Sequence, residues 1–161
     1  MAVPIKERYF EDYLVGEQIS YGDYPVTEQE MLDFATRYDP QSFHLDKDAA
    51  KNSIYGGIIA SGWLTGSIMM RLMADHFISP QASMGSPGID ELRWHLPVRA
   101  GDRLKVTVTI VSARQSTSKP DRGIVQSVHE AFNQKGDRVM SFKGMGMFLC
   151  RASISTSDAA L

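Results

Sequence analysis

The sequence predicts a single α+β domain in which a curved antiparallel sheet wraps around one long helix. Helical patterns precede residue 60, a longer apolar helix follows them, and alternating strand patterns fill most of the second half. The length of 161 residues suits one domain. We place this domain at residues 1–151 and expect the small, polar tail at 152–161 to be flexible.

The composition is that of a soluble globular protein. Hydrophobic residues make up 43% of the chain and charged residues 22%, and the net charge of −2 gives no reason to expect nucleic acid or an anionic membrane as a partner. Cys150 is the single cysteine, so an internal disulfide and a cysteine-based zinc site are excluded, and we predict no metal. No signal peptide or membrane-spanning run is visible, and we expect a cytoplasmic location.

Two helices are predicted before residue 60. Thr27 and Glu30 form a capping box at the start of the first, and Pro40 ends it because the residue before a proline is disfavoured in helical geometry. Asp46 is a good N-cap for a second, short helix, which Gly56-Gly57 stops. The stretch between them, YDPQSFHLD at residues 38–46, is predicted to be an irregular link.

A long helix is predicted to begin after Ser61, a plausible N-cap. Apolar residues surround its axis almost completely, which is typical of a buried helix. The rest of the chain reads as antiparallel strands at about 89–96, 103–113, 123–132 and 138–150. Gly144 and Gly146 share one face of the last strand, and we expect the long helix to approach the backbone there.

Asp39 and His44 are the candidate acid/base residues. A lone Asp beside a proline is usually a turn residue and a lone His is usually structural, but Pro40 breaks the helix, so a loop can bring both side chains to one point. At pH 7 an ordinary Asp is charged and an ordinary His is mostly neutral. Such a pair can accept a proton from water and return one, which favours hydration or hydrolysis without a metal.

Gly62 is the candidate oxyanion-binding residue. The first N–H groups of a helix lack internal partners and lie at the positive end of the helix dipole. Without a side chain, Gly62 would let a carbonyl oxygen approach these groups. The competing interpretation is that Gly62 is only a close packing point. His95 and His129 lie in predicted strands without an evident partner.

These residues resemble the MaoC-like hydratase/dehydratase family, of the (R)-specific enoyl-CoA hydratase type. The resemblance rests on FATRYDPQSFHLDKDAA, YGGIIASGWLT and WHLPVRAGDRL, and it runs from about Tyr9 to Cys150. It implies a hot-dog fold and a homodimer or higher homo-oligomer. It also implies reversible addition of water to a trans-2-enoyl-CoA to give a 3-hydroxyacyl-CoA, in fatty acid metabolism.

The resemblance gives Asp39 and His44 the role of positioning water and moving its proton, and Gly62 that of binding the thioester oxygen. Phe43, Ser61 and Trp63 are expected to line the substrate pocket. No cofactor is implied, because coenzyme A is part of the substrate. Two other functions stay open: an acyl-CoA thioesterase, which attacks the carbonyl carbon instead of C3, and a non-catalytic acyl-CoA-binding module.

Overall fold

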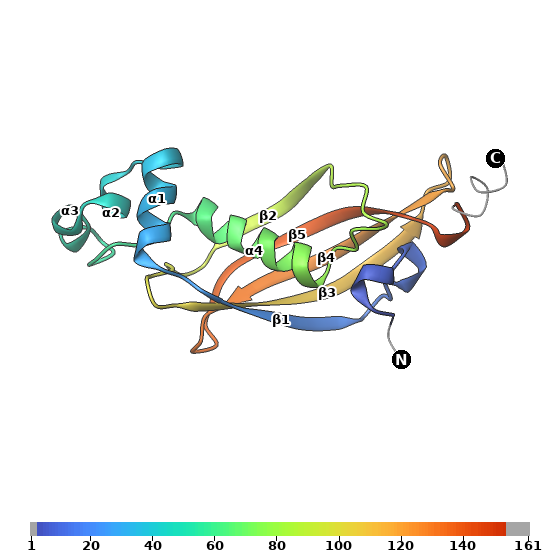
Figure 1. Cartoon of the computed structure of the whole chain (residues 1–161), viewed down its shortest axis with the longest axis horizontal. Coiled ribbons are helices and arrows are strands. Elements are labelled where there is room, and N and C mark those ends of the chain that lie inside the picture. Colours follow the sequence, from blue (N-terminus) through green and yellow to red (C-terminus); the bar gives the residue numbers. More distant parts are fainter. Residues whose placement is uncertain (1–2, 154–161) are drawn as a thin grey trace.

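The computed structural model describes residues 3–153 and consists of a long helix lying across one face of a five-stranded antiparallel sheet (Figure 1). The strand order is β1-β3-β4-β5-β2. The strands are β1 Gln18–Pro25, β2 Gly88–Trp94, β3 Arg103–Gln115, β4 Arg122–Phe132 and β5 Arg138–Leu149. The helices are α1 Glu28–Tyr38, α2 Ser42–Leu45, α3 Lys47–Lys51 and α4 Gly62–His76, with 3-10 turns η1 Ile5–Glu7, η2 Phe10–Asp12 and η3 Arg151–Ser153.

This architecture confirms the predicted α+β hot-dog fold. Of the tail predicted at 152–161, the first two residues belong to η3, and residues 154–161 lie outside the described residues.

The predicted N-caps Thr27 and Asp46 are confirmed, but the Glu30 half of the capping box is not, because the Glu30 carboxylate accepts a hydrogen bond from the Tyr24 hydroxyl. The Thr27 side chain accepts a hydrogen bond from the Glu30 N–H, and α1 ends at Tyr38, two residues before Pro40. The Asp46 carboxylate accepts hydrogen bonds from two N–H groups at the start of α3. The link between α1 and α3 is more regular than predicted, because the Asp46 N–H donates to the Ser42 carbonyl and closes the single turn α2.

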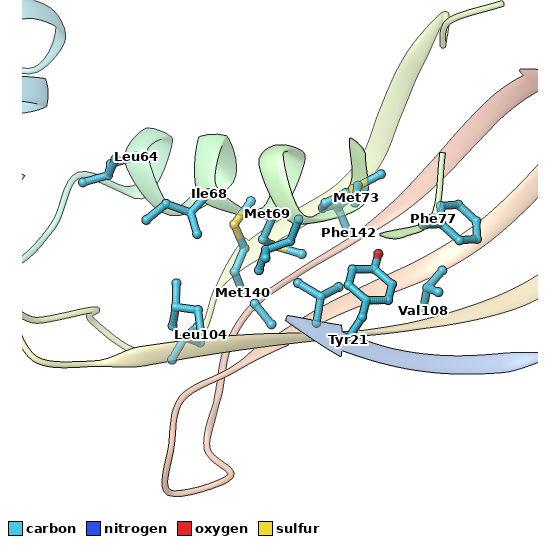
Figure 2. Close-up of a cluster of buried hydrophobic side chains, with 14 of the residues drawn as sticks. Tyr21, Leu64, Ile68, Met69, Met73, Phe77, Leu104, Val108, Met140 and Phe142 are labelled. Atoms are coloured by element: carbon cyan, nitrogen blue, oxygen red, sulfur yellow. The ribbon is translucent and has the colours of Figure 1, made fainter. Parts of the chain in front are cut away.

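The inner face of α4 carries much of the core. Leu64, Ile68 and Met69 are buried on the side that faces the sheet (Figure 2). The opposite side is open, since Trp63 is 60% exposed and Met70 is 48% exposed. The prediction that α4 is enclosed on all sides is therefore wrong for the single chain: the sheet covers one side only.

The central strands follow the predicted alternation, and β3 places Leu104, Val106, Val108 and Ile110 in the core. The sequence shows no clear strand alternation over β1. In the structure this strand is irregular, because Gly22 has a φ of 87° and the register with β3 shifts between Tyr21 and Tyr24. Edge strand β2 is also irregular, with a register shift between Asp90 and Arg93.

The expectation that α4 approaches the glycines of β5 is wrong. A Cβ atom on Gly144 would lie 3.2 Å from His129 Nε2, and one on Gly146 would lie 2.8 Å from the Phe148 ring. Side chains of the sheet itself, rather than the helix, occupy the space that these glycines leave.

Candidate active site

Asp39 and His44 meet where α1 gives way to α2. Asp39 is the C-cap of α1, with φ −149° and ψ 65°, and His44 lies in the single turn of α2. The Asp39 Oδ2 and His44 Nε2 atoms are 3.1 Å apart. The imidazole is 5% exposed and the carboxylate 18%, so the pair is largely shielded from bulk water. The change of direction at Pro40 brings the two side chains together, as the sequence suggested.

The orientation of the His44 ring follows from its second nitrogen. Nδ1 lies 2.8 Å from the carbonyl oxygen of Ile59, and a carbonyl oxygen can only accept, so Nδ1 carries a proton. Nε2 then faces Asp39 Oδ2, and a hydrogen bond at this contact requires a second proton between the two atoms. The pair is therefore arranged to hold one exchangeable proton that either partner can carry.

Two further donors bind the Asp39 carboxylate. The Ser61 hydroxyl donates to Oδ2 at 2.7 Å, and the Gln41 side-chain amide donates to Oδ1 at 2.6 Å. Burial favours the neutral acid and is the largest single influence on its pKa, but the bonds from Gln41 and Ser61 and the nearby His44 together outweigh it. The pKa of Asp39 is lowered, and the group is a carboxylate at neutral pH.

Gly62 begins α4 beside this pair. The Ser61 hydroxyl accepts from the Trp63 N–H, and the Ser61 carbonyl accepts from the next two N–H groups. The Gly62 N–H has no acceptor within residues 3–153. It is thus the free donor of the first turn, at the positive end of the helix dipole.

The Trp94 side chain explains why position 62 is a glycine. The indole Nε1 donates to the Gly62 carbonyl oxygen at 2.9 Å, and a Cβ atom on Gly62 would lie 2.4 Å from Trp94 Cε2. Gly62 is therefore a close packing point, and it also lines the cavity described next.

A cavity of about 420 Å³ brings these groups together. Asp39, His44 and Gly62 line it, as do the predicted pocket residues Phe43 and Trp63. The remaining walls come from the loop before α4 and from the end of β2: Gln41, Tyr55, Ile59, Ala60, Thr65, Trp94, His95, Leu96, Pro97 and Val98. This volume lies within the range of small-molecule sites.

Ser61 is the exception among the predicted pocket residues. It is fully buried and does not line the cavity; its hydroxyl lies behind the carboxylate, between Asp39 and the start of α4. Its place as N-cap turns the hydroxyl inward. Ser61 therefore holds the Asp39 carboxylate through a hydrogen bond and is not part of the pocket wall.

Sequence reasoning missed Gln41 and Trp94. Gln41 stands inside the Asp39–His44 stretch, and its polar side chain two residues after the acid is a local signal of a turn around a carboxylate. Trp94 lies 32 residues beyond Gly62, and only the pairing of β2 with β5 brings it to the site.

Within residues 3–153, no group of three or more His, Cys, Asp or Glu side chains could hold a metal ion. The same part of the chain contains no helix with the length and hydropathy needed to cross a membrane.

Known proteins share this fold and sequence. The family model described as "MaoC like domain" matches residues 13–131. The crystal structure of the MaoC-like dehydratase from Rhodospirillum rubrum is 36% identical, with a TM-score of 0.84, and the match covers 89% of this chain and 98% of that one.

Two other relatives are more distant. The (R)-hydratase PhaJ1 from Pseudomonas aeruginosa, in its unliganded form, is 25% identical with a TM-score of 0.70, over 88% of this chain and 85% of that one. Protein MaoC from Klebsiella aerogenes is 29% identical over 103 residues, which is 63% of this chain but only 30% of the relative's length. The extent of the family match and the similarity to the Rhodospirillum rubrum structure lead to one conclusion: the chain belongs to the MaoC-like domain family of hydratases and dehydratases.

Proposed function

We propose that the protein is a hydratase/dehydratase that adds water reversibly to the double bond of a trans-2-enoyl-CoA and gives a 3-hydroxyacyl-CoA. One observation carries this proposal: the Asp39–His44 pair and the free N–H of Gly62 line the same cavity. Hydration of a thioester-conjugated double bond needs these two functions, namely proton transfer at water and stabilisation of an enolate oxygen. The hydratase and dehydratase among the relatives support the same chemistry.

The proposed addition begins with a water molecule held by Asp39 and His44. The Asp39 carboxylate accepts a proton from this water as its oxygen bonds to C3 of the substrate. The C2–C3 π electrons move toward the thioester carbonyl, and the resulting enolate oxygen accepts a hydrogen bond from the Gly62 N–H. Such a donor at a helix start contributes a few kcal/mol to an oxyanion-like transition state.

The second half of the proposed reaction delivers a proton to C2. His44, whose Nδ1–H is bonded to the Ile59 carbonyl, donates the proton held on Nε2 to the enolate carbon. Asp39 then passes the proton taken from water to His44 across their 3.1 Å contact, which restores the starting state. Dehydration follows the same steps in reverse. Every proton moves between water, substrate and these two side chains, so the proposed reaction requires no cofactor besides the CoA moiety of the substrate.

We also propose that the protein acts as a homodimer that pairs through the β2 edge. This strand ends the sheet, and the apolar side chains of Ile89, Trp94 and Leu96 on and next to it are 45–48% exposed in the single chain. An unpaired edge with apolar side chains is a ready surface for a second copy.

The test is turnover of crotonyl-CoA and of longer and branched enoyl-CoAs, followed by enoyl absorbance together with release of free thiol. We expect absorbance to fall without thiol release. Asp39→Asn and His44→Gln are each expected to lower kcat by about 10²-fold or more. Asp33→Asn, an exposed change on the same helix as Asp39, is the matched control and should leave kcat unchanged.

Two results would contradict the proposal. Thiol release from saturated acyl-CoA would indicate a thioesterase. Binding of acyl-CoA without turnover across the whole panel would indicate a non-catalytic module.

A further inference from the structure

A second cavity lies along the exposed side of α4. Its volume is about 530 Å³, and its other walls come from β2, β4, β5 and the segment 77–86 that follows α4. Trp63 lines both this cavity and the one that holds Asp39 and His44, so the two cavities are neighbours. Most of the lining is apolar, including Met70, Met73 and Met140. Adaptable methionine side chains of this kind suit a flexible apolar chain.

Two polar side chains of the central strand β4 interrupt this apolar lining. Ser127 is 4% exposed and His129 is 1% exposed, and the Ser127 hydroxyl lies 2.8 Å from His129 Nε2. Both residues line the cavity. Burial of polar side chains in an apolar layer costs stability unless their hydrogen bonds are made.

The surroundings of His129 provide a shaped place for the imidazole. Its ring stacks on Phe142 with centroids 4.8 Å apart and meets the edge of Phe77 at 5.3 Å. Across from it, Gly144 has no side chain, and a Cβ atom there would lie 3.2 Å from Nε2. The glycine that was expected to admit the helix instead makes room for this histidine.

The pair has more hydrogen-bonding capacity than the protein uses. His129 Nδ1 is buried and has no hydrogen-bond partner among residues 3–153. If the Ser127 hydroxyl donates to Nε2, the Nδ1–H is left over; if Nε2–H donates to Ser127, the serine proton is left over. In either arrangement one donor of the pair remains, and both residues line the apolar cavity next to the candidate active site.

We propose that the acyl chain of the substrate enters this second cavity and carries an uncharged oxygen, as a hydroxyl or keto group, that accepts a hydrogen bond from the Ser127–His129 pair. This inference rests on the proposed function, which places the thioester at Gly62. The His129 ring contacts Phe77, the C-cap of α4, which is 15 positions beyond Gly62 and therefore about 22 Å away along the helix. The oxygen therefore belongs near the far end of a long acyl chain.

The chemistry of the pair excludes a charged group at this position. Burial lowers the pKa of His129 to about 4, so the imidazole is neutral at pH 7. A neutral pair between Phe77 and Phe142 has no positive charge to offset a carboxylate, whose transfer into an apolar site is costly.

The experiment compares enoyl-CoAs of increasing length in matched sets: unsubstituted, with a hydroxyl near the far end, and with a carboxylate there. Among chains long enough to reach the pair, we expect wild-type kcat/KM to be about tenfold higher for the hydroxylated chain than for the unsubstituted one, and lowest for the carboxylate. Most of this rise in kcat/KM should come from a lower KM, because the hydrogen bond to the chain oxygen is remote from the reacting atoms. Crotonyl-CoA is the internal reference, since it is too short to reach β4.

Ser127→Ala and His129→Phe should each weaken the preference for the hydroxyl, because the donor that remains is no longer held in place by its partner, and should leave crotonyl-CoA kinetics unchanged. Thermal unfolding of both variants separates a lost contact from a lost fold, and Ser127→Ala, the smaller change, keeps the test valid if His129→Phe does not fold. Hydration of crotonyl-CoA with no preference for oxygen at any length, or a preference as large in both variants as in wild type, would overturn this inference and leave the proposed function standing.

If no enoyl-CoA of the panel is hydrated, the proposed function fails, and calorimetric binding decides the inference separately. Tighter binding of the hydroxylated saturated acyl-CoA than of the unsubstituted one supports it, and equal affinity overturns it.

Discussion

The Asp39 carboxylate is held by Ser61 and Gln41 while it contacts His44. We predict that Ser61→Ala raises the pKa of Asp39, because one of the hydrogen bonds that favour its ionised form is lost. If ionised Asp39 is the base, the acidic limb of the kcat/KM profile should then move to higher pH. The same change removes the N-cap of α4 and should cost about 1 kcal/mol of stability.

Ser67→Ala is the matched control for this prediction. Ser67 lies on the same helix and is exposed. Its hydroxyl donates a hydrogen bond to the Trp63 carbonyl and is not bonded to Asp39. The control should leave the pH profile in place. An unmoved profile in Ser61→Ala would show that this hydroxyl serves only as a cap.

Gly62 and Trp94 are packed so closely that position 62 has no room for a side chain. We predict that Gly62→Ala displaces the indole and lowers kcat/KM by about tenfold or more, since small displacements at a reacting centre are costly. Gly66→Ala on the same helix places its Cβ atom 3.4 Å from Met140 Cε and should be tolerated. Steady-state kinetics of the two variants, with Trp fluorescence as a measure of indole movement, checks this prediction.

At the scale of elements, the sequence predicted the helix ends that depend on interactions between residues close together in the chain. The caps at Thr27, Asp46 and Ser61 and the break at Pro40 are short-range effects, and the helices begin and end beside them. The Asp39–His44 contact was within reach of the sequence for the same reason, because five residues and one proline determine it. Strand β1 was missed because Gly22 and a register shift interrupt its alternation.

Contacts between distant segments were beyond sequence reasoning. Trp94 reaches Gly62 only because β2 pairs with β5, and His129 occupies the space at Gly144 only because β4 pairs with β5. The pattern of β5 showed that something must approach its glycines but could not identify the neighbour. The same limit applies to Ser127 and His129: the sequence shows that both residues are polar but does not show that they line an apolar cavity.

The edge strand β2 allows a direct test of the proposed dimer. We predict that Ile89→Asp, a charge on the exposed apolar edge, shifts the protein from dimer to monomer, because burying an unpaired carboxylate in the interface is unfavourable. Val111→Asp on β3 is the matched control, since Val111 is 47% exposed and Ile89 is 48% exposed. Light scattering after size-exclusion chromatography measures the mass. A dimer that persists in Ile89→Asp would place the interface elsewhere.

For the whole molecule, the buried imidazole makes stability depend on pH. In the unfolded chain His129 binds a proton near pH 6.5, whereas burial in the folded protein lowers its pKa to about 4. Between these values the unfolded state holds more protons, so the free energy of unfolding falls as the pH falls, by about 3 kcal/mol in total. Chemical denaturation at a series of pH values should show this loss.

His129→Phe should remove this part of the pH dependence, whereas Ser127→Ala keeps the buried imidazole and should retain it. Asp39 acts in a lower window: its pKa is lowered from 3.8, so its contribution is present above that value and is lost as the pH falls through its folded-state pKa. A flat response in wild type between pH 6.5 and 4 would show that His129 is protonated in the folded state.

The walls supplied by β2 have a consequence for motion. Trp94 closes the cavity around Asp39, while Ile89 and Leu92 of the same strand line the apolar cavity. A molecule that fills both spaces therefore contacts both ends of a strand that, within one chain, pairs with β5 alone. Amide hydrogens of β2 should exchange with deuterium markedly more slowly once a long acyl thioester is bound than in the free protein.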